Sequence, residues 1–137
     1  MSNCIFCKII AGEIPSTRVY EDEHTIVIMD IHPASIGHML VIPRTHAALV
    51  HELSAEAAGH VMKTAQKVEQ ALRKSELGVT ASNLWINNGA DAGQEVAHVH
   101  LHVVPRYPAD GIRTQVPNRP KQQLDFADIA QKISINL

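Results

Sequence analysis

The stretch that decides the fold is AHVHLHVVPR, residues 97–106, in which three histidines occupy every second position. In a β-strand, alternate side chains point to the same face and lie about 6.6–7 Å apart along the chain. A strand would therefore place His98, His100 and His102 in one row, while the apolar residues between them pack into the core. On a helix, the same positions would spread around the axis and could not form one site. The spacing predicts a strand that carries a row of imidazoles.

Three uses are open for such a row. The simplest is a solvent-facing strand that happens to carry histidine, but three alternating copies of a scarce residue are improbable without a use. The imidazoles could bind a metal ion, as histidine pairs on strands do. Alternatively, one imidazole acts as a nucleophile or general base and the others assist it. The spacing alone leaves the metal and the nucleophile alternatives open.

The segments on either side predict an α+β domain, in which a mostly antiparallel sheet carries one long helix on one face. Strands are predicted where β-branched and apolar residues gather between turn signals. The predicted strands are two within residues 18–29 with a turn near Asp22 and Glu23, a third over residues 38–42 ended by Pro43, a fourth in residues 82–89, and the histidine-rich strand.

The long helix is predicted over residues 54–78, because apolar residues recur there at helical spacing. Ser54 is a suitable N-cap and Gly78 a suitable C-terminal stop. A short C-terminal helix is predicted between Gln122 and Ser134, after a segment that several prolines make irregular.

Length and composition limit the classes of function. The 137 residues fit a single domain, 1–137, with a core at about residues 4–107 and a C-terminal extension, residues 108–137. A net charge of −2 without a basic patch argues against a nucleic-acid partner. No apolar run approaches the roughly 18 residues of a membrane span, so no membrane partner is expected. The N-terminus lacks the features of a signal peptide, and we expect a cytoplasmic protein.

Three stretches carry a resemblance to a known family. HVHLHVV, residues 98–104, fits the pattern His-φ-His-φ-His-φ-φ, where φ is apolar. Together with residues 4–23, 30–46 and 85–106, it resembles the histidine triad (HIT) family of nucleotide hydrolases and transferases. It is most similar to the histidine triad nucleotide-binding branch and its bacterial members. The resemblance implies a homodimer whose subunits pair through the long helix and a strand, which would extend the sheet.

The resemblance also implies catalytic roles. His100, the middle histidine, would attack the α-phosphorus of a nucleotide conjugate and form a transient nucleotidyl–histidine, from which water releases the nucleoside monophosphate. Imidazole suits this step because it is a good neutral nucleophile near pH 7. His102 would lie against the phosphate oxygens and the leaving group. His38 matches an upstream histidine that supports the triad by hydrogen bonding.

Substrate-binding residues are implied in the same way. Asp30 matches the acidic residue that holds the ribose hydroxyls, although a turn role beside Pro33 is the alternative. Four apolar residues match the walls around the base, with plain core packing as an equal alternative: Phe6, Ile9, Ile28 and Ile31. Polar or glycine positions near the phosphate are Asn87, Gly89, Gly93 and Gln94.

This chain departs from the eukaryotic branch at two places. Glu95 stands where that branch has Ser or Thr near the phosphate, and a carboxylate there would repel phosphate unless it points away or is paired. Ile28 and Met29 replace bulkier rings at the base wall. These departures bear on substrate preference more than on the reaction.

Cys4 and Cys7 have the C-x-x-C spacing of half a zinc site. A redox pair would be expected after a strand in a thioredoxin-like pattern, which is missing here. Galactose-1-phosphate uridylyltransferases and similar bacterial triad proteins bind zinc through two cysteines and matching histidines. The resemblance therefore implies a structural zinc held by Cys4, Cys7, His46 and His98, with free thiols as the alternative, and no catalytic metal.

The leading functional prediction is hydrolysis of purine nucleoside phosphoramidates or related nucleotidyl conjugates. Dinucleoside polyphosphate hydrolysis is an alternative within the same chemistry. A regulatory nucleotide-binding module with incidental catalysis, and a metal hydrolase in which the triad holds the ion, are alternatives of other classes. The remaining histidines, expected at the surface or at helix caps, are His24, His32, His51 and His60.

Overall fold

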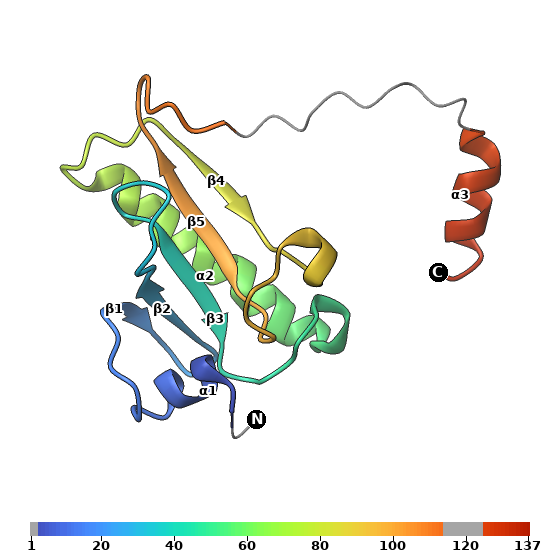
Figure 1. Ribbon diagram of the computed structural model, residues 1–137, viewed down its shortest axis with the longest axis horizontal. Coiled ribbons are helices and arrows are strands. Elements are labelled where there is room, and N and C mark those ends of the chain that lie inside the picture. Colours follow the sequence, from blue (N-terminus) through green and yellow to red (C-terminus); the bar gives the residue numbers. More distant parts are fainter. Residues whose placement is uncertain (1–2, 114–124) are drawn as a thin grey trace.

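The computed structural model describes residues 3–113 and 125–137, and five antiparallel strands form its sheet in the order β1-β2-β3-β5-β4 (Figure 1). The predicted α+β class with an antiparallel sheet is confirmed. The strands are β1 (Arg18–Glu21), β2 (Thr25–Met29), β3 (Met39–Pro43), β4 (Ala81–Trp85) and β5 (Leu101–Arg106). The α-helices are α1 (Ile5–Ile10), α2 (Ala55–Lys74) and α3 (Phe126–Ser134), and the short 3-10 turns are η1 (Val50–Glu52) and η2 (Ala90–Ala92).

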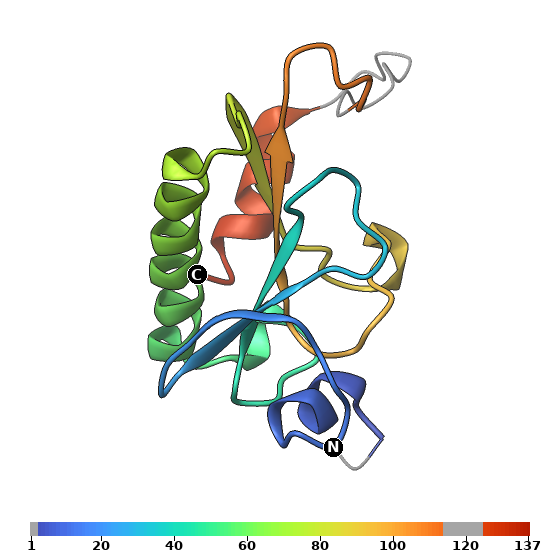
Figure 2. The same cartoon turned by 90° about the vertical axis from the view of Figure 1, so that its left-hand side faces the viewer.

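The long helix α2 packs on one face of the sheet (Figure 2). Strand residues that point to this face alternate with those that point away, as the two-residue period of a strand requires. The buried side chains of this layer form one apolar cluster, which consists of Val27, Met39, Val41, Val61, Ala65, Val68, Leu72, Leu101 and Val103.

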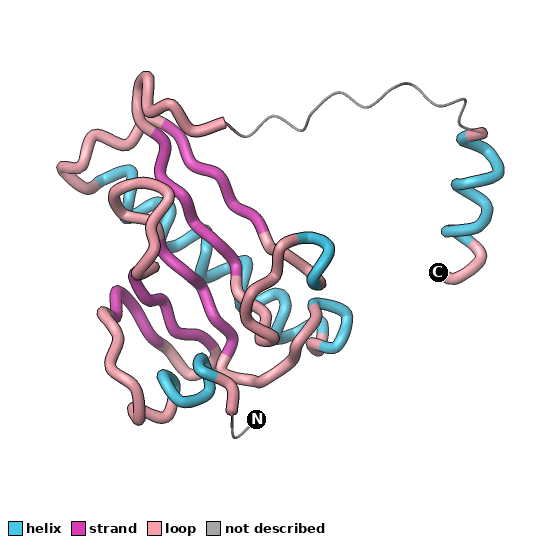
Figure 3. Tube along the Cα trace, in the orientation of Figure 1, coloured by secondary structure: helices cyan, strands magenta, loops and turns pink. Residues whose placement is uncertain are grey.

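The opposite face is covered at one end by α1, which Figure 2 shows on the other side of the sheet from α2. The apolar cluster there takes the alternate residues of β2 and β3. Its buried members are Phe6, Ile9, Ile26, Ile28, Leu40 and Ile42. The rest of this face, where β3 and β5 run side by side (Figure 3), carries the histidines.

Several boundaries differ from the prediction. Pro43 is the last residue of β3 rather than its stop, because it pairs with Thr25 at the strand end. Helix α2 ends at Lys74, where the Ser75 hydroxyl donates to the Leu72 carbonyl, so Gly78 lies beyond the helix end. The short C-terminal helix starts at Phe126, and residues 122–124 of the prediction lie outside the described residues.

Ser54 caps α2 as the sequence predicts. Its hydroxyl accepts a hydrogen bond of 3.1 Å from the Ala57 amide, which would otherwise have no partner in the first turn. The cap fixes the start of the helix that packs on one face of the sheet.

Replacing Ser54 with Ala should lower the free energy of unfolding by about 1 kcal/mol, because the Ala57 amide loses its acceptor. Ser54→Asp supplies another acceptor and should retain most of the stability. Urea denaturation of the three proteins measures this. Equal losses in both variants would show that the hydroxyl does not act as a cap.

Candidate functional site

The three histidines do not all lie in one strand. The predicted strand is wrong for His98 and His100, because β5 begins only at Leu101. The register that pairs Val41 with Leu101 would place Pro43 opposite Val99. Proline has no amide hydrogen to continue the ladder, and the Val99 amide instead donates to the Ala47 carbonyl at 2.8 Å. The segment before β5 therefore leaves the sheet.

His98 and His100 are nevertheless buried, with 0% and 6% of their surfaces exposed. The His100 Nδ1 lies 2.7 Å from the carbonyl oxygen of His98. A carbonyl can only accept, so the His100 proton must reside on Nδ1 in the neutral ring. The Nε2 atom of His100 then carries the free lone pair, as a nucleophile requires.

A second chain of hydrogen bonds fixes the opposite tautomer at His102. The Ala34 amide donates to His38 Nδ1 at 2.9 Å, so the His38 proton is on Nε2. His38 Nε2 lies 2.9 Å from His102 Nδ1 and donates to it. Neutral His102 therefore has its proton on Nε2 and offers a hydrogen-bond donor.

Burial keeps the rings of His38 and His102 neutral. Desolvation lowers the pKa of His38, with Asp30 opposing the shift. Desolvation, together with His100 and His38, lowers the pKa of His102 from 6.5 to about 4, again against the opposing effect of Asp30. Both rings are thus uncharged near pH 7. The ring centroids of His100 and His102 lie 5.0 Å apart, so the ring with the free lone pair and the ring with the hydrogen-bond donor are neighbours.

Asp30 belongs to this group, although part of its carboxylate is already used. Its Oδ1 accepts the His32 amide at 2.8 Å, and its Oδ2 lies 3.4 Å from His38 Nε2. The turn role weighed for Asp30 is therefore present. The outer lone pairs of the carboxylate remain for a ligand, since each oxygen can accept more than one hydrogen bond.

The loop between β4 and β5 is held by Gln94. Its Oε1 accepts the Gly89 amide at 2.8 Å, and its Nε2 donates to the carbonyls of Ala48 and Val96 at 2.8 and 2.9 Å. In this structure the Gln94 amide braces the loop rather than pointing a free group at the site. The Asn87 amide donates to the Gly93 carbonyl at 3.4 Å.

The four apolar candidates for the base wall divide into two groups. Phe6, Ile9 and Ile28 are buried together in the cluster under α1, so core packing accounts for them as well as base contact does. Ile31 is 84% exposed and is not part of that cluster. Glu95 is also exposed, so its carboxylate is solvated.

Sequence reasoning missed two contacts of the triad. The ring of Trp85 lies 5.7 Å from that of His102 at an angle of 30°, because Trp85 is the β4 partner of His102. The Pro43 carbonyl lies 2.8 Å from His98 Nε2 and accepts its proton. The first contact follows from the pairing of β4 with β5, and the second from the path of the chain before β5.

The structure brings together the four residues expected to hold zinc, with all ligand atoms within 4.8 Å of one another. The Sγ atoms of Cys4 and Cys7 lie 3.4 and 3.6 Å from His98 Nδ1. Cys7 Sγ is 3.3 Å from His46 Nδ1, and the two Nδ1 atoms are 3.1 Å apart.

These spacings fit a tetrahedral zinc ion. Typical Zn–S and Zn–N bonds at tetrahedral angles place sulfur and nitrogen about 3.6 Å apart and two nitrogens about 3.3 Å apart. Because His98 donates through Nε2 to the Pro43 carbonyl, its Nδ1 lone pair faces the sulfur atoms. Two thiolates and two neutral imidazoles are also a donor set that zinc prefers.

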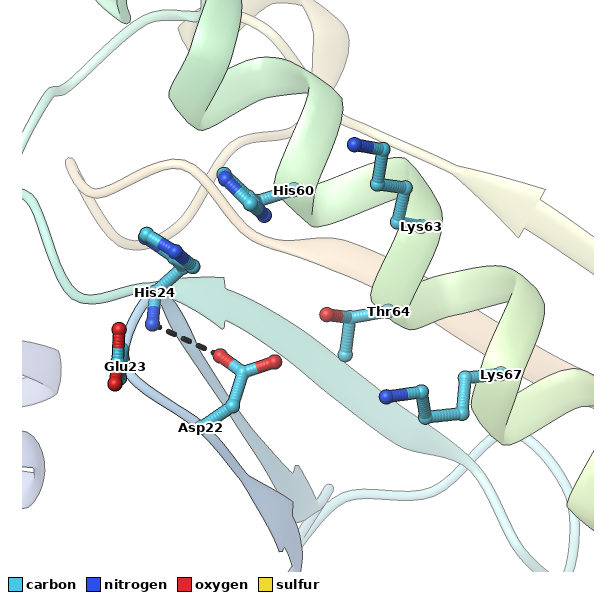
Figure 4. A pocket seen from close by; sticks show the side chains of 7 residues that line it. All are labelled: Asp22, Glu23, His24, His60, Lys63, Thr64 and Lys67. Carbon is cyan, nitrogen blue, oxygen red and sulfur yellow. Dashed lines mark hydrogen bonds between the residues drawn. The ribbon is translucent and has the colours of Figure 1, made fainter.

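A separate pair of histidines faces a shallow pocket of about 380 Å³ between the β1–β2 turn and α2 (Figure 4). The rings of His24 and His60 stack with centroids 3.6 Å apart and 14° between their planes. Lone pairs in nearly parallel planes do not converge, so the pair is not arranged to share one metal ion. This contact, which the sequence did not predict, joins the turn to the helix.

Comparison with known proteins places the chain in a family. The HIT domain family matches residues 11–109. The chain belongs to the HIT domain family, as its histidine motif indicates.

Solved structures and a curated relative agree with this. A HIT family protein from Bacillus subtilis superposes with a TM-score of 0.88 at 41% identity, covering 98% of this chain and 97% of the other. A Zn-bound histidine triad family protein from Mycobacterium smegmatis gives 0.80 at 37% identity, with 98% of each chain covered. The adenosine 5'-monophosphoramidase of Schizosaccharomyces pombe is 37% identical over 133 residues, 96% of each chain.

Among the residues that the structure describes, none of the helices combines the length and the apolar character that a membrane-spanning helix needs.

The lowered pKa of His102 predicts a pH-dependent stability. Because its pKa is about 4 in the fold and about 6.5 when unfolded, the unfolded chain binds more protons as pH falls. The contribution of neutral His102 to the free energy of unfolding should be fully present above about pH 6.5 and should be lost as the pH falls toward about 4. From about pH 7 to about pH 5, His102 should account for a loss of about 1 kcal/mol, after allowance for its partial exposure.

Urea denaturation across this pH range measures the decline. His102→Gln should flatten it, whereas His51→Gln, a change at an exposed histidine, should keep the wild-type slope. A His102→Gln slope equal to that of the wild type would contradict a buried, neutral His102.

Proposed function

We infer that the protein hydrolyses purine nucleoside phosphoramidates or related nucleotidyl conjugates through a covalent nucleotidyl–His100. The observation that carries this proposal is the 2.7 Å hydrogen bond from His100 Nδ1 to the His98 carbonyl, which leaves Nε2 unprotonated. The similarity to an adenosine 5'-monophosphoramidase supports the substrate class.

The reaction has two steps. First, the Nε2 lone pair of His100 attacks the α-phosphorus while the bond from phosphorus to the leaving amine breaks. The amine departs with the bonding pair and takes a proton from solvent. Water then attacks the same phosphorus, the phosphorus–Nε2 bond breaks and returns its electron pair to His100, and the water proton passes to solvent. The products are the amine and a nucleoside monophosphate.

In this proposal His102 acts on the phosphoryl oxygens, and His38 acts through His102. The Nε2–H of neutral His102 donates to a phosphoryl oxygen, where negative charge gathers in the transition state. His38 holds that tautomer through its own hydrogen bond to His102 Nδ1. Both rings stay neutral near pH 7 because burial lowers their pKa values.

The remaining sequence-predicted residues are proposed to hold the substrate. Asp30 would accept hydrogen bonds from the ribose hydroxyls through the lone pairs left free by His32 and His38. Gln94, Asn87 and Gly93 would shape the phosphate loop. The proposed base wall consists of Phe6, Ile9, Ile28 and Ile31.

Zinc is proposed as a structural ion bound by Cys4, Cys7, His46 and His98. When bound, it would supply bonds that join α1 to the segments before η1 and β5. The four spacings and the Zn-bound relative from Mycobacterium smegmatis support this. The proposed reaction uses no catalytic metal, because His100 and His102 provide the nucleophile and the donor.

A cytoplasmic homodimer is proposed as the assembly. Strand β4 is an edge of the sheet, and the adjoining surface of α2 carries apolar side chains. Met62 is 54% exposed and Leu84 is 41% exposed. A second copy that pairs along β4 would cover both and extend the sheet.

His100→Ala should slow AMP release from adenosine 5'-phosphoramidate by several powers of ten, because no lone pair remains to attack phosphorus. A control variant, His51→Ala, should retain the wild-type rate. Brief exposure to a chelator should leave that rate unchanged. The rates are measured by chromatography of released AMP.

An inactive wild-type protein that still binds AMP tightly would instead favour the regulatory binding module. Faster cleavage of diadenosine triphosphate than of the phosphoramidate would favour the polyphosphate hydrolase. Immediate loss of activity with chelator would favour a metal hydrolase.

Protein prepared without added metal or affinity tag should contain about one zinc per chain, measured by elemental mass spectrometry. Cys7→Ser should lose most of it, because Cys7 Sγ lies near both His46 and His98. His51→Ala serves as the control and should keep it. Wild-type protein without near-stoichiometric zinc, iron or cobalt would contradict the proposed site.

A further inference from the structure

The short helix α1 contributes to the cysteine–histidine group, which consists of Cys4, Cys7, His46 and His98, and it also contacts the triad. Cys4 is its N-cap and Cys7 lies within it, so both cysteines belong to one turn of chain. Phe6, between them, is buried. Its ring meets the ring of His100 edge-on, with centroids 5.0 Å apart and an angle of 71°, and that of His98 at 5.9 Å and 85°. One element thus carries two proposed metal ligands and a ring packed on the nucleophile.

A second route joins the same two sites through His98. Its Nδ1 faces Cys4 and Cys7 at 3.4 and 3.6 Å, while its Nε2 donates to the Pro43 carbonyl. Its own carbonyl oxygen accepts the proton of His100 Nδ1. The side chain of His98 therefore contacts the two cysteines, and its backbone carbonyl holds the ring of His100.

We propose that Phe6, beyond its proposed place in the base wall, is a positioning residue that, together with the His98 backbone, couples metal binding at the Cys4–Cys7–His46–His98 group to nucleotide binding at His100. The proposal rests on the proposed function, because it takes His100 as the residue that meets the nucleotide phosphate. It adds that each site changes the affinity of the other.

The physical reason is a shared cost of ordering. Six residues are too few for a helix to be stable alone, so α1 depends on its contacts, and metal bonds to Cys4 and Cys7 would fix it. Fixing α1 and His98 also restricts the His100 ring, through Phe6 and through the carbonyl. A phosphate at His100 Nε2 requires the same ring orientation. Each ligand therefore removes part of the ordering cost of the other, which gives positive coupling.

Coupling separates this role from simple packing. Phe6 also belongs to the apolar cluster with Ile9 and Ile28, so any substitution there lowers stability. While the folded state remains fully populated, lower stability alone leaves the ratio of zinc affinities with and without nucleotide unchanged. Only a positioning role changes that ratio, and linkage requires the same factor for both ligands.

The experiment measures the zinc affinity of the full chain by competition with a chromophoric chelator, with and without saturating AMP. In the wild-type protein, AMP should tighten zinc binding by about fivefold or more, and zinc should tighten AMP binding by the same factor in calorimetry. AMP in solution competes weakly for zinc, which changes the apparent affinity in the opposite direction. Phe6→Leu should still bind both ligands but reduce the factor toward one.

Ile10→Val is the matched control, because Ile10 lies on the same helix and packs on the same cluster. It should keep the wild-type factor. AMP binding that leaves zinc affinity unchanged would overturn the coupling and leave the proposed hydrolase intact. Absence of AMP binding would overturn the coupling and the nucleotide site on which the proposed function rests. Absence of zinc binding would overturn the coupling and the proposed zinc site, and would leave the proposed hydrolysis at His100 intact. Full coupling in Phe6→Leu would overturn the role of Phe6.

Discussion

The hydrogen bond from His100 Nδ1 to the His98 carbonyl is the contact on which the chemistry of this site depends. It places the His100 proton on Nδ1 and leaves the Nε2 lone pair free. The bond exists because the chain leaves the sheet before β5, where Pro43 cannot continue the ladder. The same departure turns the His98 side chain toward the two cysteines. One interruption of a strand thus serves two sites.

The second half of the site is a chain of hydrogen bonds that ends at His102, whose Nε2–H is a hydrogen-bond donor. The Ala34 amide fixes the tautomer of His38, which in turn fixes that of His102. Burial keeps both rings neutral, so His102 presents an N–H rather than a positive charge. Two imidazoles 5.0 Å apart therefore have opposite tautomers, one with a lone pair and one with a proton. A phosphorus centre with its oxygens is a substrate that uses both.

Much of this arrangement could be predicted from the sequence. Periodicity predicted the sheet and α2, and the resemblance to the HIT family grouped His100, His102 and His38, as well as the four candidate zinc ligands. The start of β5 at Leu101 could not be predicted, because it depends on the strand register that would place Pro43 opposite Val99. The tautomers, the exposure of Ile31 and the bracing role of Gln94 depend on three-dimensional contacts that no local pattern records.

The most direct test of the account is to look for the covalent intermediate. Rapid acid-free quenching of the protein during turnover of adenosine 5'-phosphoramidate, followed by peptide mass spectrometry, shows whether a residue carries an adenylyl group. The account predicts one adenylyl group on the peptide that contains residues 98–106, attached at His100 and absent from His100→Ala. Turnover with no adenylylated peptide, or with the group on His102, would contradict it.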